Sequence, residues 1–135
     1  MSVFVDTSAL YALLVSTEER HAAVRAAFER LLRTAEPLET TSYVLVETSA
    51  LLQHRIGLPA VRDLDDHLVP VLMVNWVDRA LHERGMLRLR RENRRKLSFV
   101  DCVSLELMRD RGLTTALALD VHFREAGHRL VPAQK

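Results

Sequence analysis

Two short apolar runs near opposite ends of the sequence each end on an aspartate. The first covers residues 3–5 and is followed by Asp6, and the second covers residues 116–119 and is followed by Asp120. Strands of a parallel sheet are buried on both faces and read as continuous apolar runs of this kind. Ligands of such sheets bind just beyond the carboxyl ends of the strands. The two runs therefore predict a parallel sheet with acidic side chains at its ligand-binding edge.

Further strand candidates alternate with amphipathic helices along the chain. The predicted strands cover residues 2–5, 39–41, 71–74, 114–119 and 129–131. The predicted helices cover residues 18–34, 42–56, 59–68, 77–92 and 98–112, and a short helix begins after Asp6. This alternation is typical of a mostly parallel sheet covered by helices on both faces. We expect a single α/β domain over residues 1–135.

The composition excludes several other classes of protein. A chain of 135 residues, of which 48% are apolar, can bury a core as a single soluble domain. Its one cysteine, Cys102, excludes an internal disulfide and fits a reducing compartment. The opening apolar run lacks a basic flank and is interrupted by Asp6, so no signal peptide is expected. No apolar run is long enough for a membrane span, and we expect a cytoplasmic protein with no membrane partner.

Glu47 is the acid whose surroundings are least suited to a charge. Its neighbours three and four residues away along the predicted helix are Tyr43, Val44, Ala50 and Leu51. Burial of a carboxylate among them without a partner would cost several kcal/mol of folding free energy. The sequence therefore predicts a metal ion or a basic partner beside Glu47, unless the carboxylate reaches water at the edge of the apolar stripe.

The other candidate acids each have a structural explanation as well. Ser98 and Asp101 match a capping box, and Asp6 and Asp120 are each placed to cap a helix that follows a strand. However, the ends of two parallel strands fall at the same edge of the sheet. Acids that converge there repel one another, and their pKa values rise unless a cation is present. Carboxylate ligands suit magnesium or manganese rather than zinc.

Basic residues crowd one stretch of the chain although the net charge is only +1. The basic residues between positions 88 and 96 are Arg88, Arg90, Arg91, Arg94, Arg95 and Lys96. A local basic stripe can bind a phosphate backbone, and we take Arg91, Arg94 and Arg95 as candidates for nucleic-acid binding. The alternatives are a solvated helix face and a contact with a partner protein.

Taken in order, these motifs resemble those of PIN-domain ribonucleases. The motifs are Val5-Asp6-Thr7-Ser8-Ala9-Leu10, Glu47 within a helix, Ser98-Phe99-Val100-Asp101 and Leu119-Asp120-Val121-His122-Phe123. The length and the ending resemble the VapC toxins of prokaryotic type II toxin–antitoxin pairs. The resemblance implies a five-stranded, mostly parallel sheet and metal-dependent endonucleolytic cleavage of RNA.

The resemblance also implies roles for individual residues. The catalytic and metal-binding acids would be Asp6, Glu47, Asp101 and Asp120. Thr7 and Ser8 would support Asp6, and the acids would hold one or two Mg²⁺ or Mn²⁺ ions that activate a water for attack on the phosphate. A homodimer and a cognate antitoxin are implied as well, with a basic antitoxin side chain inserted among the acids.

Some alternatives remain open from the sequence. A catalytically inactive PIN-like module that binds RNA or protein would carry the same motifs. A phosphoacceptor signalling domain needs a lysine at the end of a late strand, and neither Lys96 nor Lys135 is placed there. His122 is expected to be a surface or capping histidine rather than a substrate contact. The apolar residues of helices 42–56 and 59–68 exceed what a small sheet needs, which predicts a homodimer interface or an antitoxin groove.

Overall fold

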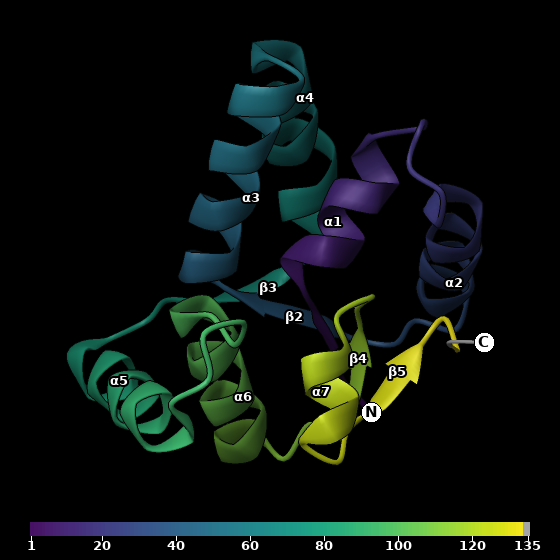
Figure 1. Cartoon of the computed structure of the whole chain (residues 1–135). Coiled ribbons are helices and arrows are strands. Elements are labelled where there is room, and N and C mark those ends of the chain that lie inside the picture. The colour runs from purple at the N-terminus through teal and green to yellow at the C-terminus, as the bar shows by residue number, and fades with distance from the viewer. Residues whose placement is uncertain (134–135) are drawn as a thin grey trace.

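The computed structural model describes residues 1–133, so the last two residues of the predicted domain, including Lys135, lie outside the described part. Within this part, five strands form one sheet in the order β3-β2-β1-β4-β5 (Figure 1), and every neighbouring pair is parallel. The strands are β1 (Val3–Val5), β2 (Leu38–Thr41), β3 (Met73–Asn75), β4 (Thr115–Leu117) and β5 (Arg129–Val131). The predicted α/β sheet is confirmed.

Helices cover both faces of the sheet. One side carries α1 (Thr7–Leu14), α2 (His21–Arg33), α3 (Ser42–Arg55) and α4 (Leu58–Asp63), and the other carries α5 (Arg79–Glu92), α6 (Phe99–Arg111) and α7 (Val121–Glu125) (Figure 1). The strand order explains this division. From β1, the strands β2 and β3 are added on one side of the sheet, and β4 and β5 are then added on the other side of β1. Right-handed connections place the helices of the two halves on opposite faces.

The central strand sets the position of the acidic edge. Phe4 and Val5 are fully buried, and the Phe4 ring centroid lies 5.9 Å from that of Phe123 in α7. Val5 of β1 is paired with Leu117 of β4, so the carboxyl ends of these two strands are level. The residues that follow both strands therefore leave the sheet at the same edge.

The predicted and observed elements differ mainly at their boundaries. After α4 the chain makes one π-helical turn (Leu64–Leu68) and one 3₁₀ turn (Val69–Val71). Pro70 has no amide hydrogen to donate and lies in this 3₁₀ turn, so β3 begins at Met73 rather than at residue 71. Across residues 1–133, no helix combines the length and the apolar character needed to cross a membrane.

Candidate active site

Asp6 leaves β1 at the edge of the sheet and caps α1. Its amide donates to the Leu117 carbonyl at 3.0 Å, and its Oδ2 accepts from the Ser8 amide at 3.2 Å. The residue is only 3% exposed. The structure therefore gives Asp6 both the capping position and the position at the strand end that the sequence predicts.

The hydroxyl groups of Ser8 and Thr7 have different partners. Ser8 Oγ donates to Asp6 Oδ2 at 2.7 Å and accepts from the Leu119 amide at 2.9 Å, so it joins the residues that follow β1 and β4. Thr7 Oγ1 donates to the Val44 carbonyl of α3 at 3.4 Å. Ser8 thus holds Asp6 directly, whereas Thr7 fixes α1 against α3.

Asp101 and Asp120 meet from two further helix starts. Asp101 is buried in the first turn of α6, where it completes a capping box with Ser98. Asp120 caps α7 and accepts from the His122 amide at 2.9 Å. Ligand atoms of Asp101, Asp120 and His122 all lie within 4.8 Å of one another.

Burial and the repulsion of neighbouring acids make the carboxyl groups of Asp6 and Asp101 hard to ionise. The pKa of Asp6 is raised from 3.8 to about 7, mainly by desolvation, with the charges of Asp101 and Asp120 adding to the effect and the hydrogen bonds from Ser8 opposing it. Desolvation also raises the pKa of Asp101 to about 6, with Asp120 adding to the effect and Ser98 opposing it. Both shifts favour the binding of a cation, which stabilises the ionised carboxylates.

The hydrogen bonding of the two Asp6 carboxylate oxygens indicates whether the site fits a metal ion. Among the described residues, Asp6 Oδ1 is buried and has no hydrogen-bond partner, whereas Oδ2 is held by Ser8. A buried carboxylate oxygen without a partner is costly. The donors near it are the carboxylates of Asp101 and Asp120 and the imidazole of His122, and carboxylates are the ligands of hard divalent ions. The residues therefore fit a divalent metal.

Glu47 lies at the margin of this arrangement. It is half-buried on α3, and the hydroxyl of the next residue, Thr48, donates to Thr7 Oγ1 at 3.1 Å. Among the described residues, neither Glu47 nor Asp6 belongs to the group of ligand atoms that lie within 4.8 Å of one another, but the charges of Asp101 and Asp120 act on Asp6 and that of Glu47 is not among its influences. The structure brings Asp6, Asp101 and Asp120 together and places Glu47 on the neighbouring helix.

The basic candidates are exposed, and one of them touches the acidic cluster. Arg91 lies in the last turn of α5, and Arg94 and Arg95 lie between α5 and α6. Arg94 Nη2 lies 3.1 Å from His122 Nδ1 and 3.2 Å from Glu125 Oε1. The basic stretch is therefore attached to the helix that Asp120 caps.

Sequence reasoning underestimated two residues. His122 was expected to be structural, and its position two residues after Asp120 was the only signal that it joins the acidic cluster. Glu39 in β2 is fully buried and accepts from Arg111 Nε at 3.0 Å and Asn75 Nδ2 at 3.2 Å. Its partners are distant in sequence, so no local pattern could identify this buried ion pair.

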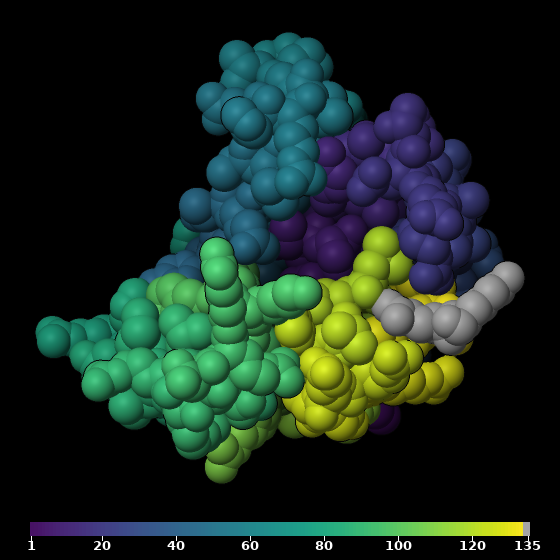
Figure 2. Space-filling model, in the orientation of Figure 1, coloured from purple at the N-terminus to yellow at the C-terminus, as the bar shows by residue number. Residues whose placement is uncertain are grey.

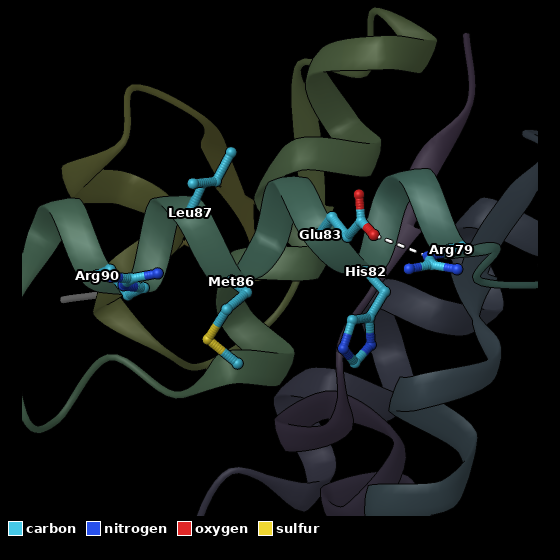
Figure 3. A pocket seen from close by; sticks show the side chains of 6 residues that line it. All are labelled: Arg79, His82, Glu83, Met86, Leu87 and Arg90. Atoms are coloured by element: carbon cyan, nitrogen blue, oxygen red, sulfur yellow. Dashed lines mark hydrogen bonds and ion pairs between the residues drawn. The ribbon is translucent and has the colours of Figure 1, made fainter.

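The face of the molecule in Figure 2 is hollowed over the N-terminal segment. Figure 2 shows purple atoms of the N-terminal segment in a depression between the teal atoms of α3, the green segment of α5 and α6, and the yellow segment of α7. A separate hollow of about 550 Å³ runs along α5 (Figure 3) and contains none of the four acids. It is lined by Arg79, His82, Glu83, Met86, Leu87 and Arg90. The cluster of Asp6, Asp101 and Asp120, rather than this hollow, is the candidate active site.

Known proteins share this arrangement over almost the whole chain. The sequence profile of the PIN domain family matches residues 3–129, and the chain belongs to this family. The 23S rRNA-specific endonuclease VapC20 of Mycobacterium tuberculosis is 37% identical over 127 residues, which are 93% of this chain and 94% of the relative. The crystal structure of M. tuberculosis VapC20, a Sarcin-Ricin loop cleaving toxin, has a TM-score of 0.81 and 34% identity, and the match covers 93% of this chain and 95% of that one.

These relationships confirm the expected class of function, a PIN-domain ribonuclease of the toxin type. They do not favour the catalytically inactive module. A phosphoacceptor signalling domain is inconsistent with the family to which the chain belongs.

Proposed function

We propose that the protein is an endoribonuclease that depends on Mg²⁺ or Mn²⁺, with one or two ions held by Asp6, Asp101 and Asp120 and with Glu47 at the margin. The observation that carries this proposal is the buried, unpaired Oδ1 of Asp6 beside two further acids. When bound, a divalent ion supplies the Lewis-acid chemistry that activates water and stabilises charge on a phosphate.

The residues around the acids prepare them for this role. Ser8 binds Oδ2 of Asp6 and leaves Oδ1 free for a cation. Ser98 fixes Asp101 through its backbone amide, which donates to Asp101 Oδ2 at 3.0 Å. Because both carboxylates are held before a ligand arrives, little conformational entropy is lost when it binds.

We propose structured ribosomal RNA as the substrate. The curated relative is named as an endonuclease specific for 23S rRNA, and its solved structure is described as a toxin that cleaves the sarcin–ricin loop. Both match almost the full length of this chain. Arg91, Arg94 and Arg95 are exposed near the acids and are suited to contact the phosphate backbone of such a loop.

We further propose that the protein acts in the cytoplasm as a homodimer that a cognate antitoxin inhibits. An apolar face on α3 and the segment after β3 supports a protein partner, because Val46 is 68% exposed and Trp76 is 77% exposed. A basic antitoxin side chain placed among the acids would neutralise the same carboxylates that a metal ion neutralises.

The deciding experiment is cleavage of purified bacterial 23S rRNA, and of an oligonucleotide copy of its sarcin–ricin loop, in the presence of Mn²⁺ or Mg²⁺. We expect discrete fragments that disappear in EDTA and with Asp6→Asn. The matched control is Asp78→Asn, which makes the same chemical change at the cap of α5. Cleavage in EDTA, or undiminished cleavage by Asp6→Asn, would contradict metal-dependent catalysis at this site.

A second comparison separates the substrate from the activity. Transfer RNA and 16S rRNA are incubated under the same conditions. Cleavage of these RNAs with 23S rRNA left intact would retain the endoribonuclease and reject the proposed ribosomal loop.

A further inference from the structure

The segment between α5 and α6, residues 93–98, is attached to the acidic cluster through one histidine; we call this segment the basic loop. His122 Nε2 lies 3.0 Å from the Lys96 carbonyl oxygen of the basic loop and 3.6 Å from Asp120 Oδ1. The imidazole ring of His122 therefore stands between the backbone of the basic loop and a carboxylate of the site.

The partners of His122 determine which ring nitrogen carries hydrogen. A backbone carbonyl can only accept, so the contact with Lys96 requires a hydrogen on Nε2 whether the ring is neutral or charged. While this hydrogen bond exists, Nε2 has no lone pair to offer to a metal ion. Nε2, the ring nitrogen that faces Asp120, is therefore hydrogen-bonded to the basic loop.

The other ring nitrogen faces a second pair of groups. Nδ1 lies 3.1 Å from Arg94 Nη2 and 3.2 Å from Glu125 Oε1, and Arg94 Nη2 also donates to Glu125 at 3.2 Å. Arg94 is therefore held by α7 at the rim of the site. Among the described residues, the side chains of Arg95 and Lys96 have no ion-pair partner, and both residues are exposed.

The ends of the basic loop are also fixed. Asn93 ends α5 in the left-handed conformation with φ of 49°, and Leu97 is 3% exposed. A cavity of about 80 Å³, lined in part by Arg88, Leu97 and His122, lies beside this junction. The basic loop is thus anchored at both ends, and its middle is attached through His122.

We propose that His122 is a positioning residue that fixes the basic loop beside the metal-binding acids, so that Arg95 and Lys96 bind RNA phosphates flanking the scissile bond. The inference rests on the proposed ribonuclease function and assigns His122 to the binding of RNA rather than of metal. The inference thus assigns Arg94, one of the candidates for RNA binding, to the junction with α7, and assigns Arg95 and Lys96, the next two residues, to the RNA contacts.

Two substitutions at His122 separate positioning from metal binding. Glutamine places its amide nitrogen near the position of Nε2 and can still donate to the Lys96 carbonyl. Asparagine places its amide nitrogen near Nδ1 and cannot reach that carbonyl. His67→Asn, at an exposed histidine of the π-helical turn, is the matched control.

Three measurements on the purified full chain test the proposal. Amide hydrogen exchange of residues 94–98 reports the attachment of the basic loop without RNA or metal. Calorimetric titration with Mn²⁺ reports metal affinity, and binding of the sarcin–ricin oligonucleotide in EDTA, over a range of salt, reports RNA contacts. None of the three depends on cleavage, so they remain informative if the proposed catalytic activity fails.

With His122→Asn we expect exchange in the basic loop to increase about tenfold and RNA affinity to fall about fivefold, as the loss of one well-placed hydrogen bond permits. The salt dependence of binding should decrease, because fewer phosphates are contacted. Mn²⁺ affinity should be unchanged, and His122→Gln should restore both loop protection and RNA affinity.

Other outcomes would overturn the proposal. Loss of Mn²⁺ affinity in both His122 variants, with loop exchange unchanged, would make His122 a metal ligand. Faster loop exchange with unchanged RNA affinity would remove the basic loop from RNA binding. Equal effects of His122→Asn and His67→Asn would show that the change is not specific to this junction.

Discussion

At the scale of single residues, the same side chains begin helices and form the site. Asp6 and Asp120 cap α1 and α7, and Asp101 completes the capping box of α6. Capping had been the competing explanation for each of these acids, and the structure bears it out without removing them from the site. The cap fixes the carboxylate at a helix start, and three helix starts meet at one edge of the sheet.

The raised pKa of Asp6 predicts how the stability of the metal-free protein depends on pH. Between the ordinary value of 3.8 and the folded value of about 7, the folded carboxyl keeps a proton that the unfolded chain releases. Stability therefore falls as the pH rises through this range and becomes level above it. Asp6→Asn retains a good cap and removes the titration. In EDTA at about pH 8 it should raise the free energy of unfolding by at most about 4 kcal/mol, measured by urea denaturation.

The effect of Asp6→Asn should be small below about pH 3, where the carboxyl is largely protonated in both the folded and the unfolded state. Asp78→Asn is the control, because Asp78 caps α5 outside the acidic cluster. If metal-free Asp6→Asn protein is no more stable than the wild type at about pH 8, the ionised carboxylate of Asp6 does not destabilise the folded protein.

Glu47 yields a separate prediction because it lies on α3 and its charge is not among those that raise the pKa of Asp6. Glu47→Gln should lower kcat for RNA cleavage by about 10- to 100-fold, as the loss of an outer partner of a metal site does. The loss should be smaller than that caused by Asp6→Asn. Glu29→Gln, on the exposed face of α2, is the control. If kcat is the same in both glutamine variants, Glu47 has no part in the site.

The predictability of the site differs from residue to residue. Asp6, Asp101 and Asp120 could be identified because each follows a strand or starts a helix, and both features are local in sequence. The contact of His122 with the Lys96 carbonyl depends on how the basic loop folds back onto α7, and the position of His122 two residues after Asp120 is the only local signal of its involvement. The Glu39–Arg111 pair joins β2 to α6 across 72 positions, so it becomes visible only when the fold is known.

At the scale of elements, the packing of α5 against α6 depends on one glycine. A Cβ atom added to Gly85 would lie 2.5 Å from Val103 Cγ2 and 3.3 Å from the Val103 backbone. The two helices can approach this closely because Gly85 has no side chain. Their relative position in turn sets where the basic loop joins the start of α6.

Gly85→Ala should therefore destabilise the protein by about 1–3 kcal/mol, since overpacking outweighs the better helix propensity of alanine. Urea denaturation measures the change. Adding Val103→Ala removes the closest contact, and the double variant should lose less stability than the sum of the single variants. Additive losses would mean that the two residues do not meet in solution.

Element boundaries were predictable where side chains set them. Ser98 and Gly112 bound α6 as the sequence predicts, because one caps the first turn and the other adopts the left-handed conformation after the last. The start of α2 was placed too early, at residue 18 instead of His21, because residues 16–20 form turns that carry no strong local signal. The five strands followed from their apolar runs and turn residues, and their order in the sheet came from long-range pairing.

At the scale of the whole molecule, one face remains apolar and exposed. Trp76 and Val46 border the same hollow of about 370 Å³ between α3 and the segment after β3. The excess of apolar residues that the sequence shows on the helix over 42–56 thus corresponds to surface as well as to core. Exposed apolar surface of this kind marks an interface.

We expect the double variant Val46→Ser and Trp76→Ser to shift the protein from dimer to monomer in light scattering coupled to size exclusion. The reason is that burial of these side chains would provide much of the hydrophobic stabilisation of the dimer. Leu87→Ser, at a 62% exposed leucine on α5, is the control. A dimer that survives the double variant but dissociates with Leu87→Ser would place the interface on α5 instead.

The hydrogen bonds of Ser8 have a consequence for how the chain is made. Ser8 links Asp6 to the amide of Leu119, so the site is closed by contacts between the two ends of the chain. A ribosome that synthesises this protein releases most of the sequence before β4 can pair with β1. Until then the chain carries Asp6, Glu47 and Asp101 without the segment after β4 that completes the candidate site. We therefore expect a fragment that terminates before Leu119 to leave RNA intact and only a nearly complete chain to act as a nuclease.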